Sequence, residues 1–211
     1  MGDLSDALET LIAEHLRIGS PVPAYLRPGQ HADNVRKQIA ALVGVDPPAD
    51  AFDLFTWHDG IDNERWEKDG AGTGFARLFG DTHFAPIADA VKEYRDRIET
   101  DRRTAEYAIG GEAPQTWKPS WFPVFCGGWD TYGIECDPNN PDLGRIYDPA
   151  WDPPPGVRPG PRFRSLLHLV QSATRRFEAG GYSWDPATRF LEEQLEILDP
   201  LYEREIAEAR A

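Results

Sequence analysis

The five histidines are the first residues to test for metal binding or acid–base catalysis. They are His15, His31, His58, His83 and His168. No pair of them shows HExxH or HxH spacing, and none stands at metal-ligand spacing from a cysteine. His58 follows Trp57 at the predicted end of a helix, where an imidazole favours the helix dipole and packs on the indole. The histidine pattern therefore predicts structural roles.

Two polar segments carry residue types that bind ions. Residues 70–74 read Gly-Ala-Gly-Thr-Gly, but no predicted strand precedes them and no Gly-Lys-Ser/Thr follows, so they predict a loop and not a phosphate site. Asp137, Asn139, Asn140 and Asp142 offer the oxygen ligands that calcium prefers. Pro141 occupies a ligand position and no glutamate closes the loop, so turn formation explains these residues better.

Ser165 and Cys126 are the candidate nucleophiles. Ser165 lacks the Gly-x-Ser-x-Gly context, and a Cys126 thiolate would need a nearby base and partial exposure. Buried cysteines are far commoner. If the hairpin turns near Thr131, Cys126 and Cys136 lie opposite each other on one face, as buried thiols in a reducing compartment. Carboxylate pairs arise by chance in so acidic a chain, so we expect no catalytic residue, no metal site and no cofactor.

The charge balance limits the classes of partner. The formal net charge is −14, which repels nucleic acid and anionic membranes and favours basic proteins, although solubility alone also explains it. No run of 18 apolar residues is present, and the acidic start lacks the basic region of a signal peptide. We therefore expect a cytoplasmic protein that binds neither nucleic acid nor membranes. The oligomeric state stays open.

Tryptophans and carboxylates in predicted loops are the candidate contact residues. Seven tryptophans are many for 211 residues, and most lie at turns and element edges. Buried tryptophans seal a core, whereas exposed ones beside carboxylates make binding hot spots. The predicted partner-binding residues are Asp59, Asp62, Trp129, Asp130, Trp151 and Asp152.

Residues 121–148 must form the pleated part of the scaffold. Apolar residues alternate with others from Phe122 to Cys126 and again from Tyr132 to Cys136, and turn residues separate the runs. A further short run surrounds Ile146. Period-two patterning bounded by glycine, asparagine and proline is typical of half-buried antiparallel strands. We expect a mainly antiparallel sheet of four to six strands with helices on its flank, an α+β fold.

Helical spacing of apolar residues predicts the flanking helices. Helices are expected over residues 4–18, 34–43, 50–58, 86–98 and 163–179. Residues 61–74, 100–118 and 148–161 are expected to be loops, with a short strand possible at 75–79 and strand character at 107–109. Asp185-Pro186 and Asp199-Pro200 each place a capping carboxylate before a proline, which predicts two consecutive C-terminal helices broken near Asp199.

Short motifs follow one another in a distinctive order along this scaffold. They are His58-Asp59-Gly60 after a proline-led helix, Trp121-Phe122-Pro123-Val124, Gly127-Gly128 with Asp130, Gly144-Arg145-Ile146, and a helix start at Ser165-Leu166. Their order resembles the SUKH superfamily, the domain of the Smi/Knr fungal cell-wall regulators and of many bacterial immunity proteins. The resemblance covers residues 33–180, flanked by a helix and proline-rich connector at 1–32 and a helical extension at 181–211.

The resemblance implies a protein-binding function without catalysis. Bacterial members of the superfamily are typically immunity proteins that bind and neutralise a cognate toxin, and an acidic inhibitor suits a basic toxin domain. An intracellular regulator or scaffold of the Smi/Knr type is the alternative. A hydrolase with two carboxylates facing each other in a tryptophan-lined cleft is the third reading.

Overall fold

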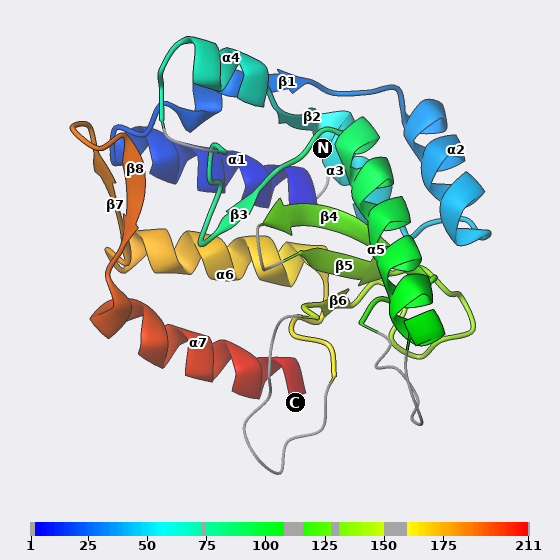
Figure 1. Cartoon of the computed structure of the whole chain (residues 1–211). Coiled ribbons are helices and arrows are strands. Elements are labelled where there is room, and N and C mark those ends of the chain that lie inside the picture. The colour runs from blue at the N-terminus through cyan, green and yellow to red at the C-terminus, as the bar shows by residue number, and fades with distance from the viewer. Residues whose placement is uncertain (1–2, 73–74, 108–115, 128–130, 150–159, 211) are drawn as a thin grey trace.

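Helices and small antiparallel sheets alternate along the chain, and together they form an α+β fold. The computed structural model describes residues 3–72, 75–107, 116–127, 131–149 and 160–210 (Figure 1). The helices are α1 (Asp3–Arg17), η1 (Val22–Tyr25), α2 (Ala32–Val43), α3 (Ala49–Trp57), α4 (Asn63–Lys68), α5 (Ile87–Tyr107), α6 (Leu166–Glu178) and α7 (Leu195–Arg210). The strands are β1 (Leu26–Pro28), β2 (His58–Ile61), β3 (Thr82–His83), β4 (Trp121–Gly127), β5 (Tyr132–Glu135), β6 (Ile146–Tyr147), β7 (Tyr182–Asp185) and β8 (Phe190–Glu193).

The central sheet has four antiparallel strands in the order β3-β4-β5-β6. The three predicted strands of residues 121–148 are confirmed as β4, β5 and β6. The register shifts between Pro123 and Phe125, so β4 holds one extra residue opposite β5. This bulge interrupts the predicted alternation, and Phe125 joins Phe122 and Val124 in the main core.

The register of β4 and β5 separates the two cysteines. Cys126 pairs with His83 of β3, whereas the backbone N–H of Cys136 donates to the carbonyl of Ser120. The prediction that the cysteines lie opposite each other is therefore wrong, because a turn near Thr131 would pair Cys126 with Cys136, whereas the observed register pairs Trp121 with Glu135. Both thiols are free and buried, as expected.

A second aromatic cluster lies apart from the main core. It consists of Trp117, Trp121 and Tyr147, with Ile98 of α5 packed against it. The rings of Trp121 and Tyr147 stack at 4.3 Å between centroids. Gly133 of β5 makes room for this packing, since a Cβ there would lie 2.8 Å from the Trp117 ring.

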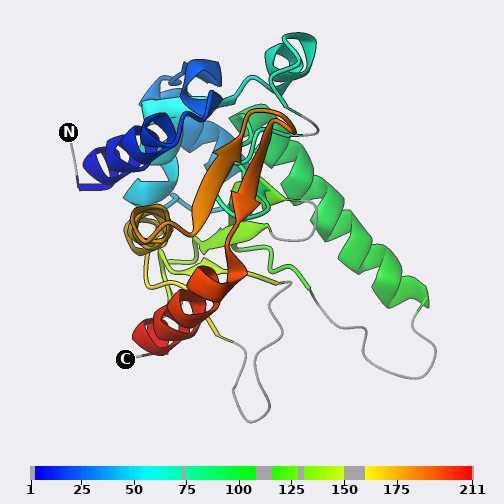
Figure 2. The ribbon, with the colours of Figure 1, turned by 90° about the vertical axis from the view of Figure 1, so that its left-hand side faces the viewer.

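One continuous core joins both ends of the chain to the sheet. Leu8 and Leu11 of α1, Val170 of α6 and Leu198 of α7 belong to the same buried cluster. Helices α1 and α6 lie side by side, with α5 on the opposite side of the molecule (Figures 1 and 2). The segments that sequence analysis set apart as 1–32 and 181–211 therefore share the core of residues 33–180. No helix within the described ranges is both long and apolar enough to cross a membrane.

Two segments predicted as loops are partly regular. Residues 61–74 contain the end of β2 and the short helix α4, which Asp62 caps by accepting from the backbone N–H of Arg65 at 3.0 Å. Helix α5 continues to Tyr107, through residues predicted as a polar loop. Arg102 bonds to Glu99 and Glu106 one turn away on either side, and such pairs support a helix that has no apolar stripe. Residues 75–79, where a short strand was possible, form no strand; Phe79 makes only an isolated bridge to Thr82, where β3 begins.

The prediction of two C-terminal helices is wrong for the first of them. Residues 182–193 form the β7–β8 hairpin. The Asp185 carboxylate accepts from the backbone N–H groups of Ala187 at 2.8 Å and Thr188 at 3.3 Å, and Pro186 follows it. Asp-Pro thus opens a turn here and not a helix, since both motifs use the same residues. Helix α7 begins at Leu195 and continues through Pro200.

Candidate protein-binding cleft

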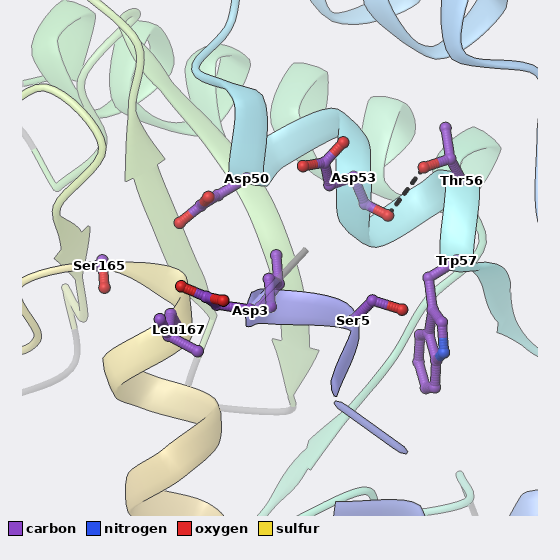
Figure 3. Close-up of a pocket in the computed structure, with 9 residues that line it drawn as sticks. Asp3, Ser5, Asp50, Asp53, Thr56, Trp57, Ser165 and Leu167 are labelled. Atoms are coloured by element: carbon purple, nitrogen blue, oxygen red, sulfur yellow. Dashed lines mark hydrogen bonds between the residues drawn. The ribbon is translucent and has the colours of Figure 1, made fainter. Parts of the chain in front are cut away.

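A cleft of about 620 Å³ opens where the N-terminal turns of α1 and α6 meet α3 (Figure 3). Its walls combine carboxylates, hydroxyl groups, two leucines and one indole. The lining residues are Asp3, Leu4, Ser5, Asp50, Asp53, Thr56, Trp57, Ser165 and Leu167. These residues come from three distant parts of the sequence.

Helix α3 supplies the acidic wall. Ala51, Leu54 and Phe55 face the core and are fully buried. Helical geometry then places Asp50 and Asp53, three residues apart, together on the opposite, cleft-facing side. Figure 3 shows Asp50 and Trp57 extending from α3 toward α6 and α1.

The two α3 carboxyl groups share an environment that disfavours their charge. Burial raises the pKa of Asp50, and the neighbouring Asp53 raises it further, whereas a hydrogen bond from the backbone N–H of Leu167 lowers it. Burial also raises the pKa of Asp53. Asp50 therefore ties α3 to the N-terminus of α6, while the carboxylate of Asp53 stays exposed to solvent.

Trp57 forms a fixed wall at the end of α3. Its indole Nε1–H donates to Glu9 Oε1 of α1 at 2.7 Å. The indole also stacks on Phe84 at 6.2 Å and meets the His58 ring edge-on at 4.4 Å. The packing of His58 on Trp57 agrees with its predicted structural role. These contacts hold the half-buried indole in one orientation beside the cleft.

Negative charge in the cleft is uncompensated within the described chain. Asp3, Asp50 and Asp53 form no ion pair with a described basic residue. Basic residues elsewhere pair with nearby acids, as Arg17 does with Glu14. The cleft can therefore attract a positively charged group, and the hydroxyl groups of Ser5 and Thr56 can hydrogen-bond beside it.

Asp59 is not an exposed loop residue, contrary to the sequence-based expectation. It lies in β2, is 3% exposed, and accepts hydrogen bonds from Gln30 Nε2 at 2.8 Å and the backbone N–H of Ile87 at 2.9 Å. Arg27 lies 3.8 Å away. The carboxylate of Asp59 thereby caps the start of α5 from inside the fold, which leaves little surface for a partner.

Of the other predicted contact residues, only Asp62 lies within the described ranges, and it does not line the cleft. Asp62 is half-buried and caps α4. Trp129, Asp130, Trp151 and Asp152 lie outside the described residues. Sequence reasoning missed Asp50 and Asp53, although their i, i+3 spacing opposite Ala51, Leu54 and Phe55 was a usable signal. No sequence pattern could show that α1 and α6 would face them.

A smaller pocket of about 400 Å³ lies between α5 and strands β3 and β4. Cys126 and His83 line it together with Glu93. Burial raises the pKa of the Cys126 thiol to about 12, and the nearby charge of Glu93 contributes to this increase. Burial lowers the pKa of His83. This environment suppresses the thiolate that nucleophilic catalysis requires. Across the described ranges, no group of three or more potential ligands could hold a metal ion.

Comparison with known proteins supplies no family assignment. No protein-family model matches the chain, and no curated protein matches it. The case for function therefore rests on the residues of the cleft and on the order of motifs along the sequence.

Proposed function

We propose that this protein is a non-catalytic protein-binding domain, of the immunity type, that neutralises a cognate toxin with a basic surface. The resemblance of the motif order to the SUKH superfamily supports the class of function. The cleft supplies a place where binding can occur. A regulatory or scaffolding protein of the Smi/Knr type is the alternative, and it would use the same kind of surface.

The observation that carries the proposal is the uncompensated negative charge of the cleft beside a fixed indole. Asp3, Asp50 and Asp53 have no described cation partner, and Trp57 is held by Glu9 and Phe84. Aromatic anchors next to charged groups are typical centres of protein interfaces. A net charge of −14 adds long-range attraction for a basic partner and raises the association rate.

Isothermal titration against the product of the adjacent reading frame tests this proposal. Asp53→Asn removes a cleft charge with little change of shape, and Asp33→Asn removes one exposed charge at the start of α2 as the matched control. We expect Asp53→Asn to weaken binding at least about tenfold, because loss of a close charge pair typically costs about 2 kcal/mol or more.

The control should change the affinity less than about twofold, since it alters only the long-range field. Equal affinities for wild type, Asp53→Asn and Asp50→Asn would exclude the cleft as the binding site. Inhibition of the partner's activity by the wild-type protein separates the immunity reading from the scaffolding one.

A carboxylate hydrolase is the second candidate, and one observation favours it. Asp50 and Asp53 both have raised pKa values in a cleft that contains Trp57, and general acids in hydrolases require such a shift. Against it, Asp50 accepts a hydrogen bond from the backbone N–H of Leu167 at the start of α6. Turnover of a glycoside panel that Asp53→Asn abolishes would establish this reading over the first.

A further inference from the structure

The lining of the same cleft specifies more than a charge. Its lining combines the apolar side chains of Leu4 and Leu167, the indole of Trp57, and the carboxylates of Asp3 and Asp53. We propose that the cleft receives a single arginine side chain of the partner protein, in preference to lysine. This inference rests on the proposed protein-binding function and names the group that the cleft recognises.

The shape of the guanidinium group matches these walls. Its five N–H donors lie in one plane and can bond to carboxylates and hydroxyl oxygens together, whereas an ammonium group is a compact point charge. The planar group also stacks on an indole, and it is more weakly hydrated than an ammonium ion when it leaves water. Leu4 and Leu167 can pack against the methylene groups of the arginine stem.

The indole wall is already in place before a partner arrives. The hydrogen bond from Trp57 to Glu9 at 2.7 Å and the stacking on Phe84 fix its orientation. A wall that needs no ordering on binding reduces the entropic cost of association. Glu9 also places one more carboxylate against the edge of the indole, which strengthens the negative potential near Trp57.

The carboxylates differ in how free they are to bind. Asp50 accepts from the backbone N–H of Leu167, so part of its hydrogen-bonding capacity is used within the fold. The carboxylates of Asp3 and Asp53 are exposed and accept no hydrogen bond from the described residues. Asp53 is therefore the residue whose loss should most reduce arginine binding, and Asp50 acts on the site mainly through its charge.

Protonation of the cleft should release the arginine. Asp50 and Asp53 both bind protons at higher pH than ordinary carboxyl groups. Loss of their charge removes the acceptors that a guanidinium group requires. Binding should therefore begin to weaken at a higher pH than the titration of ordinary aspartates would cause.

Three tripeptides, Ac-Gly-X-Gly-amide with X as arginine, lysine or citrulline, test the inference with the full chain. The readout is the indole ¹H–¹⁵N signal of Trp57, assigned by its loss in Trp57→Phe. We expect saturable shifts with arginine, at least threefold weaker binding with lysine, and none with the neutral citrulline. Asp53→Asn should weaken arginine binding at least fivefold, and Asp33→Asn should not.

Equal binding of lysine and arginine, or binding of citrulline, would overturn the arginine preference. An arginine affinity unchanged in Asp53→Asn would overturn the placement. Both results leave the protein-binding proposal intact if partner affinity still falls in Asp53→Asn. Failure of the partner titration alone, with arginine still bound in the cleft, would refute the proposed function and not this inference.

Discussion

Acidification should destabilise the folded protein through His15, a buried residue of α1. The imidazole is 0% exposed, with Nε2 2.7 Å from the carbonyl oxygen of Leu78 and Nδ1 3.0 Å from Ser20 Oγ. Because the carbonyl can only accept, Nε2 carries the proton and Nδ1 accepts from the hydroxyl group of Ser20. The native site therefore holds a neutral imidazole, packed 4.7 Å from the Phe177 ring.

Burial lowers the pKa of His15 from 6.5 to about 4. Between these values the unfolded chain binds a proton that the folded chain excludes, so stability is complete above pH 6.5 and is lost as the pH falls towards 4. This difference corresponds to a loss of about 3 kcal/mol below pH 4 and of about 2 kcal/mol at pH 5. Because His15 is fully buried, screening by solvent does not reduce this free energy.

Urea unfolding followed by tryptophan fluorescence at pH 7.5 and pH 5 measures this loss. His15→Gln is the reference, because its amide nitrogen can replace Nε2 opposite Leu78 but does not titrate. Asp50 and Asp53 act with the opposite sign, since their raised pKa values favour the folded state as the pH falls, and the variant retains them.

The stability difference between wild type and His15→Gln should shrink by about 2 kcal/mol from pH 7.5 to pH 5. A difference that stays constant between the two pH values would show that His15 does not remain neutral in the folded protein. A parallel change in the slope of unfolding with urea would indicate an altered unfolded state, so the midpoint and the slope are both reported.

Three further predictions concern buried groups. Gly133→Ala should lower the stability by about 1–3 kcal/mol and change the near-ultraviolet circular dichroism, because its Cβ would lie 2.8 Å from the Trp117 ring. Arg176→Met should cost about 3–5 kcal/mol in urea unfolding, because Glu205 stays buried without its cation; a cost below about 1 kcal/mol would contradict the pairing. Cys126 should react with a thiol reagent at pH 8 about a thousandfold more slowly in the folded chain than in urea, because burial raises its pKa to about 12. Equal rates in the two states would refute its burial.

Several helices could be predicted from local patterns because their signals lie within a few residues. The apolar spacing of α1 and α6 and the left-handed Gly44 after α2 identify their positions directly. The polar end of α5 was missed because ion pairs, and not an apolar stripe, support it. The β7–β8 hairpin was missed because Asp185-Pro186 opens turns and helices equally well, and only pairing with β8 decides between them.

In the candidate site, too, local sequence patterns and tertiary contacts decide different features. The sequence predicts that Asp59 is an exposed loop carboxylate. In the structure it is buried by contacts with Gln30 and Ile87, which are distant in the sequence. The local sequence predicts that Asp50 and Asp53 are ordinary solvated residues of a short helix. Packing of α1 and α6 against α3 places both beside the cleft, and burial raises their pKa values.

The amino-acid sequence by itself determined the fold class, strands β4, β5 and β6 of the central sheet and the strongly negative charge. Periodicity and composition are properties of neighbouring residues and of sums over the chain. Only the tertiary structure decided where that charge gathers with no basic partner among the described residues, and which indole stands beside it. Burial and electrostatic potential depend on distances between residues far apart in the chain, and those distances exist only once α1, α3 and α6 have packed together.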